Sequence, residues 1–443
     1  MTAPRLRPLL PAAAVMVLGL GAGARLLGQS PIPFPGTLDE HPAIGYASRP
    51  TSDAVARLNA AMNRGEVSLD ADSRTGLLRS VLDALDVAVE SQVLVFSRTA
   101  LQRDYTGPRN PRALYFNESV AVGYIPGAPV LELAAHDPAQ GVVFYTLDAT
   151  GGPAARFTRR TTCLDCHLAT STLEVPGMIA RSHAVAADGT PLLRLGTHAV
   201  DHRTPLSRRW GGWFVTGPAA NPPGAPLGSM GNQTVSSHAG ADAASVSNRV
   251  LANWLDRPRE GDRYPSSDSD LAALLTFDHQ MHAINLLTRV NWDARMAAGG
   301  GADMPPTAAD QARVRELADY LVYADEAPLP VPVVPRPGFA EHLASRVPAD
   351  GQGRSCAQLD LASRLARYPC SFMIYSPAFA ALPDHVRDAV YERIFAVLDG
   401  QVDEPAFARL TPEGRRAAAE ILRATRDDLP AALRASTRAG GRP

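Results

Sequence analysis

Hydrophobic side chains recur every three or four residues over two early stretches of the chain, which predicts amphipathic helices. The first stretch is residues 51–65, where Thr51 or Ser52 can cap the start of the helix and a glycine can end it. The second stretch is residues 73–86, with the same spacing of apolar positions. We therefore expect two short helices in the N-terminal part of the chain.

From residue 92 the hydrophobic period changes to two, which is the spacing of strands with one buried face. Turn signals rich in proline, glycine and aspartate separate these short runs. The runs cover residues 92–97, 113–117, 120–125, 130–135 and 142–147. We predict an antiparallel meander from about residue 113 to 148.

Helical patterns return in the second half of the chain, after a loop-rich region at residues 173–265. One long helix is predicted over residues 266–297 and another over residues 307–326. Residues 327–338 form a proline-rich connector, and residues 339–443 have an all-helical pattern. The predicted fold class is α+β, with N-terminal helices, an antiparallel meander, a loop-rich middle region and a mainly helical C-terminal half.

The composition is that of an ordinary globular protein, with 45% hydrophobic and 20% charged residues. The formal net charge is −2, so nothing favours a nucleic-acid partner. All 43 basic residues are arginine, which we attribute to genome base composition because acidic residues are equally abundant.

The N-terminus has the features of an export signal. Arg5 and Arg7 precede an apolar stretch that ends in a small-x-small pattern at residues 22–24. This stretch is short for a helix that crosses a bilayer. We therefore expect residues 1–24 to be a signal peptide, with an uncleaved membrane anchor as the alternative, and residues 25–50 to be a tether. The mature protein would then be periplasmic or otherwise exported.

One short motif carries the candidate chemistry: Cys163 and Cys166 are spaced C-x-x-C, and His167 follows directly. Two thiols one turn apart can bond the two vinyl groups of a porphyrin, and the next imidazole can bind its iron. A thioredoxin-like motif would sit in a βαβ unit, whereas the preceding elements are predicted to be antiparallel. A zinc site would need a second ligand pair at finger spacing. A Cys163–Cys166 disulfide would leave the histidine and the export signal unexplained.

At these positions the chain resembles c-type cytochromes, whose attachment signature is C-x-x-C-H. The resemblance implies one covalent haem c, with Cys163 and Cys166 as the thioether attachment points and His167 as the proximal iron ligand. The stretches "ALYFNESVAVGYI", "RWGGWFVTG" and "YPCSFMIYSPAF" also resemble a group of large exported bacterial proteins with a single haem. We expect the haem-containing α+β domain to cover residues 51–326, followed by the connector and a helical region at 339–443.

The ligand on the other side of the iron decides between electron transfer and catalysis, because a filled position keeps oxygen and peroxide from the metal. Met230, in a loop rich in proline and glycine, is the first candidate for this distal position. His279 on the predicted long helix is the alternative, although a histidine on an apolar helix face usually belongs to the core. His202, His183 and Met178 are weaker candidates.

A filled distal position predicts an exported electron-transfer protein that works with a redox partner protein. One alternative is a haem enzyme of the peroxidase or oxygenase type, which would explain the length of the chain. Another is a subunit that presents haem to a larger redox complex. The chain contains one C-x-x-C-H motif, which argues against di-haem peroxidases and di-haem rubber-cleaving enzymes.

The remaining two cysteines, Cys356 and Cys370, form an even pair in an oxidising compartment, which predicts a disulfide. Residues 357–369 between them can form a helix that returns the chain. Two buried thiols are the alternative.

Overall fold

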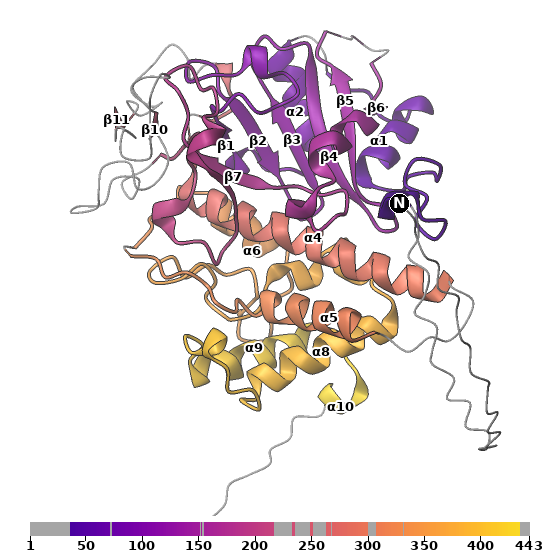
Figure 1. Cartoon of the computed structure of the whole chain (residues 1–443), viewed down its shortest axis with the longest axis vertical. Helices are drawn as coiled ribbons and strands as arrows, with labels where there is room; N and C mark the ends of the chain where they lie inside the picture. Colours follow the sequence, from indigo (N-terminus) through magenta and orange to yellow (C-terminus); the bar gives the residue numbers. More distant parts are fainter. Residues whose placement is uncertain are drawn as a thin grey trace, which may run out of the picture. The chain divides into compact units, whose positions relative to one another are not determined.

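The computed structural model describes residues 36–70, 73–150, 152, 155–216, 233–234, 249–250, 263–266, 268–299, 307–330 and 332–434. The predicted signal peptide and the first part of the tether lie outside these residues. Residues Gly36–Pro443 form one compact unit. Its fold is mixed α+β, as predicted, with an antiparallel sheet followed by a helical C-terminal half (Figure 1).

The main sheet of the described residues has the strand order β6-β5-β4-β3-β2-β1-β9, with every neighbouring pair antiparallel. The predicted meander is confirmed as β2 to β5, in which each strand pairs with the next. The strands of this sheet are β1 (Val93–Val95), β2 (Arg112–Phe116), β3 (Val120–Tyr124), β4 (Val130–Asp137), β5 (Gly141–Asp148), β6 (Thr158–Arg159) and β9 (Trp213–Phe214). Shorter pairs are β7 (Ala180–His183) with β8 (Thr197–Val200), and β10 (Gln233–Thr234) with β11 (Arg249–Val250).

Two helices cover one face of the sheet. These helices, α1 (Ala54–Asn63) and α2 (Arg74–Ala84), share a buried apolar cluster with alternate residues of β2 to β5. The helices predicted within residues 51–65 and 73–86 are confirmed as α1 and α2, but the predicted cap of the first helix is wrong. Asp53 caps α1, because its carboxylate accepts hydrogen bonds from the backbone of two residues in the first turn.

The long helix α4 (Leu271–Gly299) packs on the opposite face of the sheet. The rings of Phe116 on β2 and Phe277 on α4 stack with their centroids 4.3 Å apart. The C-terminal helices lie beyond α4 in Figure 1 and share its apolar cluster. They are α5 (Ala308–Leu321), α6 (Phe339–Ser345), α7 (Pro377–Ala380), α8 (Asp384–Leu398), α9 (Pro412–Thr425) and α10 (Ala431–Arg434). The members of this cluster run in chain order from Val93 to Leu429, so the cluster includes residues on both sides of the proline-rich connector.

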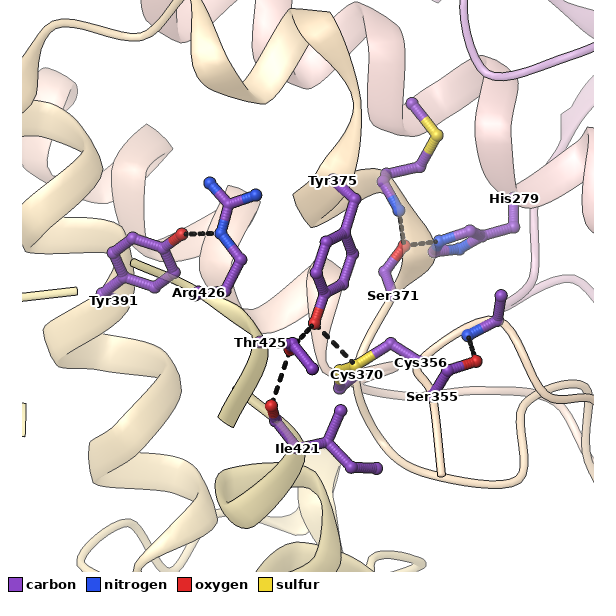
Figure 2. The surroundings of a disulfide bond; sticks show 12 residues. His279, Ser355, Cys356, Cys370, Ser371, Tyr375, Tyr391, Ile421, Thr425 and Arg426 are labelled. Carbon is purple, nitrogen blue, oxygen red and sulfur yellow. Dashed lines mark hydrogen bonds between the residues drawn. A yellow bond between two sulfur atoms is a disulfide. The ribbon is translucent and has the colours of Figure 1, made fainter. Parts of the chain in front are cut away.

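A disulfide joins Cys356 to Cys370, as predicted, with their Cα atoms 5.3 Å apart (Figure 2). The segment between them is not the predicted helix. Leu359 and Ala366 instead form an antiparallel bridge. The backbone N–H of Leu365 donates to the side chain of Glu326, 2.6 Å away, so it is not available to a helix.

Candidate functional site

The C-x-x-C-H motif lies in a single helical turn after the edge strand β6. A 3₁₀ turn over Thr161–Cys163 leads directly into α3 (Leu164–His167). Cys163 is half-buried against the core and Cys166 is exposed, and both are free thiols. Burial raises the pKa of the Cys163 thiol to about 11, so this sulfur is protonated at neutral pH. The structure therefore presents two separate thiols on one turn.

The imidazole of His167 is held in one tautomer. Its Nδ1 lies 2.9 Å from the backbone oxygen of Gly177, and because a carbonyl only accepts, Nδ1 carries the proton and donates it. The lone pair is then on Nε2, which has no hydrogen-bond partner among the described residues. The ring packs on Phe144 of β5, with centroids 4.7 Å apart. Burial lowers the pKa of His167, against the hydrogen bond to Gly177, which raises it.

Helix α4 fixes the carbonyl that orients His167. Asn285 on this helix accepts a hydrogen bond from the backbone N–H of Met178 at 3.1 Å and donates to its carbonyl at 2.8 Å. Gly177 also donates its own N–H to the carbonyl of His167. An added Cβ at Gly177 would lie 2.2 Å from Oδ1 of Asn285, so only glycine fits this contact. A chain of contacts therefore runs from α4 to the imidazole.

Part of one face of the sheet remains half-exposed beside the motif. The residues of β2 and β4 that face α1 and α2 are buried, whereas alternate residues on the other face are only half-buried. These half-buried positions are Arg112, Leu114, Val130, Glu132 and Ala134. Ala134 is paired in the register with Phe144, the residue that the His167 ring contacts. Gly123 on the intervening strand adds no side chain to this face.

Charged side chains flank this face. Arg112 donates to Glu132 at 2.9 Å, and the two form an ion pair. Arg160 donates to the hydroxyl of Thr146 at 2.9 Å. Arg181 on β7 donates to the hydroxyl of Ser171 at 3.0 Å. Asp165 inside the motif is exposed. Arginines therefore outnumber acids around the motif.

These residues fit a covalently attached haem. Such a group needs two free thiols one turn apart, an imidazole with an available Nε2, and an apolar face for the flat porphyrin. A ligand histidine also needs a partner for its other ring nitrogen, and Gly177 supplies one. Among the described residues, no group of three or more His, Cys, Asp or Glu side chains is arranged to hold a metal ion by itself.

The structure describes only one of the two methionine candidates for the distal position, Met178. Met230 lies outside the described residues, so its role stays a prediction. Met178 is buried and follows Gly177 directly, and Asn285 holds its backbone on α4. Because this segment orients Nδ1 of His167, it would lie on the proximal side of a haem bound by His167, which does not favour Met178 as the distal ligand.

His279 and His202 belong to a buried network away from the motif. His202 Nε2 lies 3.3 Å from the carbonyl of Ala324 and so carries the proton, which leaves its Nδ1 as an acceptor. His279 Nδ1 therefore donates to His202 Nδ1 at 2.8 Å. His279 Nε2 accepts from the hydroxyl of Ser371 at 2.7 Å (Figure 2). Both nitrogens of His279 are used. This placement does not favour His279 or His202 as an iron ligand.

The position of His279 along α4 also does not favour it as an iron ligand. His279 precedes Asn285, the residue that holds the His167 segment, by six positions. At 1.5 Å per residue this is about 9 Å along the helix axis. His279 also stacks on Tyr320 and Tyr323, which belong to α5 and the turn after it.

His183 on β7 is the remaining histidine candidate. Its Nδ1 lies 3.2 Å from the hydroxyl of Thr197 on β8. Its Nε2 is buried and has no hydrogen-bond partner among the described residues. Burial, with the charge of Arg181, lowers the pKa of His183 to about 4. His183 is therefore neutral at neutral pH, and its distal role stays a prediction.

Gly177, Asn285, Arg112 and Glu132 were not singled out from the sequence. Asn285 is separated from Met178 by 107 positions, so no local pattern links the two. Arg112 and Glu132 meet only through strand pairing. The Pro176-Gly177 pair shortly after the motif was the one local signal of a tight turn.

No family model, curated protein or solved structure matches this chain. Within the described residues, no helix combines the length and hydropathy needed to cross a bilayer.

Proposed function

We propose that this chain is an exported c-type cytochrome with one covalently bound haem, and that it transfers electrons to or from a partner protein. The proposal rests on the geometry and protonation of the C-x-x-C-H motif. Two free thiols stand on one turn, and the adjacent His167 donates from Nδ1 to a carbonyl, which leaves Nε2 available. This is the arrangement that a proximal haem ligand requires.

Each residue of the site has a defined part in this proposal. Cys163 and Cys166 would add their S–H groups across the two vinyl groups and fix the cofactor to the chain. His167 would bind the iron through Nε2, while Gly177 keeps the ring in the required orientation. The apolar side chains Leu114, Val130 and Ala134 on the half-exposed sheet face would exclude water from the porphyrin. The bound haem would supply a one-electron couple, which the side chains of this site lack.

Exposure of Cys166 supports electron transfer in particular. Cys163 is half-buried, whereas Cys166 is exposed, so one attached edge of the haem would lie at the surface. An exposed edge lets electrons pass to a docked partner without substrate entering the protein. Met230 remains our prediction for the distal ligand, and a thioether there would raise the reduction potential.

Haem staining after denaturing electrophoresis tests the attachment. The protein is produced with the machinery that attaches haem to c-type cytochromes, extracted with acid and acetone, and denatured. We expect the stain to stay on the band in wild type and to disappear in the Cys163→Ala, Cys166→Ala double variant. The Cys356→Ala, Cys370→Ala double variant is the matched control, and its band should stay stained. A wild-type band that loses its haem to the solvent would refute the proposal.

A further inference from the structure

Exposed apolar side chains gather on two loops at the surface of the protein. Among the described residues, four large apolar side chains are exposed: Leu101, Tyr105, Leu193 and Val334. The first three belong to the loop at residues 98–110, between β1 and β2, and the loop at residues 186–196, between β7 and β8. Leu101 is 63% exposed and Leu193 is 61% exposed, so few atoms of the protein cover either side chain.

These two loops contact each other directly. The backbone N–H of Arg98 donates to the carbonyl of Gly189 at 2.9 Å, and the Arg98 guanidinium pairs with Asp188. Gly189 has a φ of +91°, and a Cβ there would lie 2.5 Å from the backbone oxygen of Phe96. Only glycine permits so close an approach. The two loops therefore form one connected part of the surface.

Contacts inside the first loop leave its apolar side chains at the surface. The buried Gln102 donates to the carbonyl of Val130 at 2.9 Å and accepts from the N–H of the same residue at 3.1 Å. The backbone of Tyr105 is held as well, because its carbonyl accepts from the side chain of Asn110 at 2.8 Å. Gln102 takes the inward position, and its neighbour Leu101 is left in solvent.

The second loop has a small core of its own. Leu192 and Ala186 are buried together, with Ala184 and Leu195 packed against them. Because Leu192 takes the inward position, the next residue, Leu193, remains in solvent. Single exposed leucines are common on protein surfaces, but several large apolar side chains on one connected surface indicate a binding site.

The charges of the two loops are unequal, with four arginines against two aspartates. Both aspartates, Asp104 and Asp188, pair with the same Arg98, at 3.5 Å and 3.7 Å. Arg103 and Arg109 are exposed and form no ion pair with any described residue. The loops therefore combine apolar side chains with cations that are available to an anionic surface.

We propose that these loops bind the surface of a membrane that contains anionic phospholipids. Guanidinium groups bind phosphate through two parallel hydrogen bonds, and each basic side chain close to an anionic bilayer favours binding. Leucine side chains can enter the boundary between headgroups and acyl chains, and tyrosine is typical of the same depth. Leucine is under-represented among the residues that dominate protein–protein interfaces, so an acidic protein fits this surface less well. The proposal goes beyond electron transfer and does not depend on haem.

Hydrogen–deuterium exchange of the purified protein tests this surface locally. The vesicles contain equal amounts of phosphatidylglycerol and phosphatidylcholine. At short exchange times we expect slower exchange at residues 98–110 and 186–196 when these vesicles are present, and a smaller effect with phosphatidylcholine alone. The turn at residues 350–354 should exchange equally in all samples. This local readout separates the two loops from the apolar N-terminal segment, which can bind vesicles by itself.

Two double variants separate the apolar and the charged contributions. The readout is the lipid concentration that gives half of the maximal protection of the two loops. Leu101→Ser with Leu193→Ser should raise this concentration about thirtyfold, because two apolar side chains no longer leave water. Arg103→Gln with Arg109→Gln should raise it about tenfold at low salt, and this difference should shrink at high salt.

The matched controls are equally exposed residues outside the two loops. Val334→Ser is the control for the leucines, because Val334 is 65% exposed on the proline-rich connector. Arg416→Gln is the control for the arginines, because the Arg416 side chain on α9 is 67% exposed. Neither change should alter the half-maximal lipid concentration.

Equal exchange of the two loops with and without the anionic vesicles would overturn the proposal. So would equal half-maximal concentrations in wild type and in the Leu101→Ser, Leu193→Ser variant. Polyglutamate serves as the probe for an acidic protein. Protection of the loops by polyglutamate but not by vesicles would assign the surface to an acidic protein partner and would also overturn the membrane proposal.

Discussion

At the residue scale, the proposed role of His167 depends on one hydrogen bond, from its Nδ1 to the carbonyl of Gly177. The motif itself was readable from the sequence, because the thiols and the imidazole are adjacent. The contacts that orient the imidazole were not, since Asn285 reaches them from a helix 107 positions away. The reactive side chains of the motif could therefore be predicted from the sequence, whereas the contacts that orient them could be identified only from the structure.

Asn285→Ala tests this support. The variant removes both hydrogen bonds to the backbone of Met178 and leaves two buried groups unpaired. We expect a loss of about 2 to 4 kcal/mol in the free energy of unfolding, measured with urea on the haem-loaded protein. The electron paramagnetic resonance signal of the ferric haem should also change, because the His167 ring loses its fixed orientation.

The control for this change is Asn291→Ala on the same helix. Asn291 is also buried and donates to the carbonyls of Pro138 and Ala381. It should lower stability as well but leave the ferric signal as in wild type. An Asn285→Ala protein with an unaltered signal would show that α4 does not orient the ligand.

At the element scale, the sheet and the long helix were predictable because their hydrophobic periods are distinct. The meander appears as β2 to β5, and α4 appears close to the expected residues. The predictions were wrong where a side chain forms a hydrogen bond to the backbone that the local sequence pattern does not reveal. Asp53 rather than Thr51 or Ser52 caps α1, and Glu326 takes a backbone N–H that the expected helix after Cys356 would have needed.

We expect the contact between α4 and the C-terminal region to depend on pH through the network around His279. Burial lowers the pKa of His279 well below its usual value of 6.5, with a smaller contribution from His202. The unfolded chain therefore binds a proton more readily than the folded chain as the pH falls below 6.5. The stability due to the neutral ring is present above pH 6.5 and is lost toward acid, at about 1.4 kcal/mol per pH unit for each such histidine.

In His279→Gln, the free energy of unfolding should depend less steeply on pH, because the contribution of one histidine is removed. The measurement is the free energy of unfolding by urea between pH 5 and 6.5 in wild type and variant. Burial raises the pKa of Asp278 to about 7, so its effect has the opposite sign, but it is common to both proteins and cancels in the comparison. His385→Gln, on the exposed part of α8, is the control. Equal slopes in wild type and His279→Gln would contradict the account, and a changed haem spectrum would restore His279 as a ligand.

The disulfide closes a segment with a sequence separation of 14 residues. In the chain-entropy model, a loop of this size contributes about 3 kcal/mol by restricting the unfolded state. Cys356→Ala with Cys370→Ala should lower the free energy of unfolding by about this amount and leave the haem spectrum unchanged. Alkylation without reductant, followed by intact-mass measurement, provides the check on the bridge. Two alkylated sites in haem-loaded wild type would mean that the bridge is not formed in solution.

At the scale of the whole molecule, the described residues from Gly36 onward form one compact unit. One apolar cluster extends from β1 to the C-terminal helices, so the sheet that carries the motif and the helices beyond α4 stabilise each other. The mixed fold class was predictable from the sequence of hydrophobic periods along the chain. The pairing of distant elements was not, because neither the His202–His279 contact nor the Arg112–Glu132 contact has a local sequence signal.

The absorption spectrum of the purified protein, oxidised and reduced, with and without carbon monoxide, tests the central proposal most directly. An electron-transfer haem c with a filled distal position should be low-spin in both states and bind carbon monoxide slowly or not at all. With Met230 as the ligand, a near-infrared band should be present and should disappear in Met230→Ala. High-spin iron that binds carbon monoxide at once would contradict electron transfer as the sole function and favour a haem enzyme.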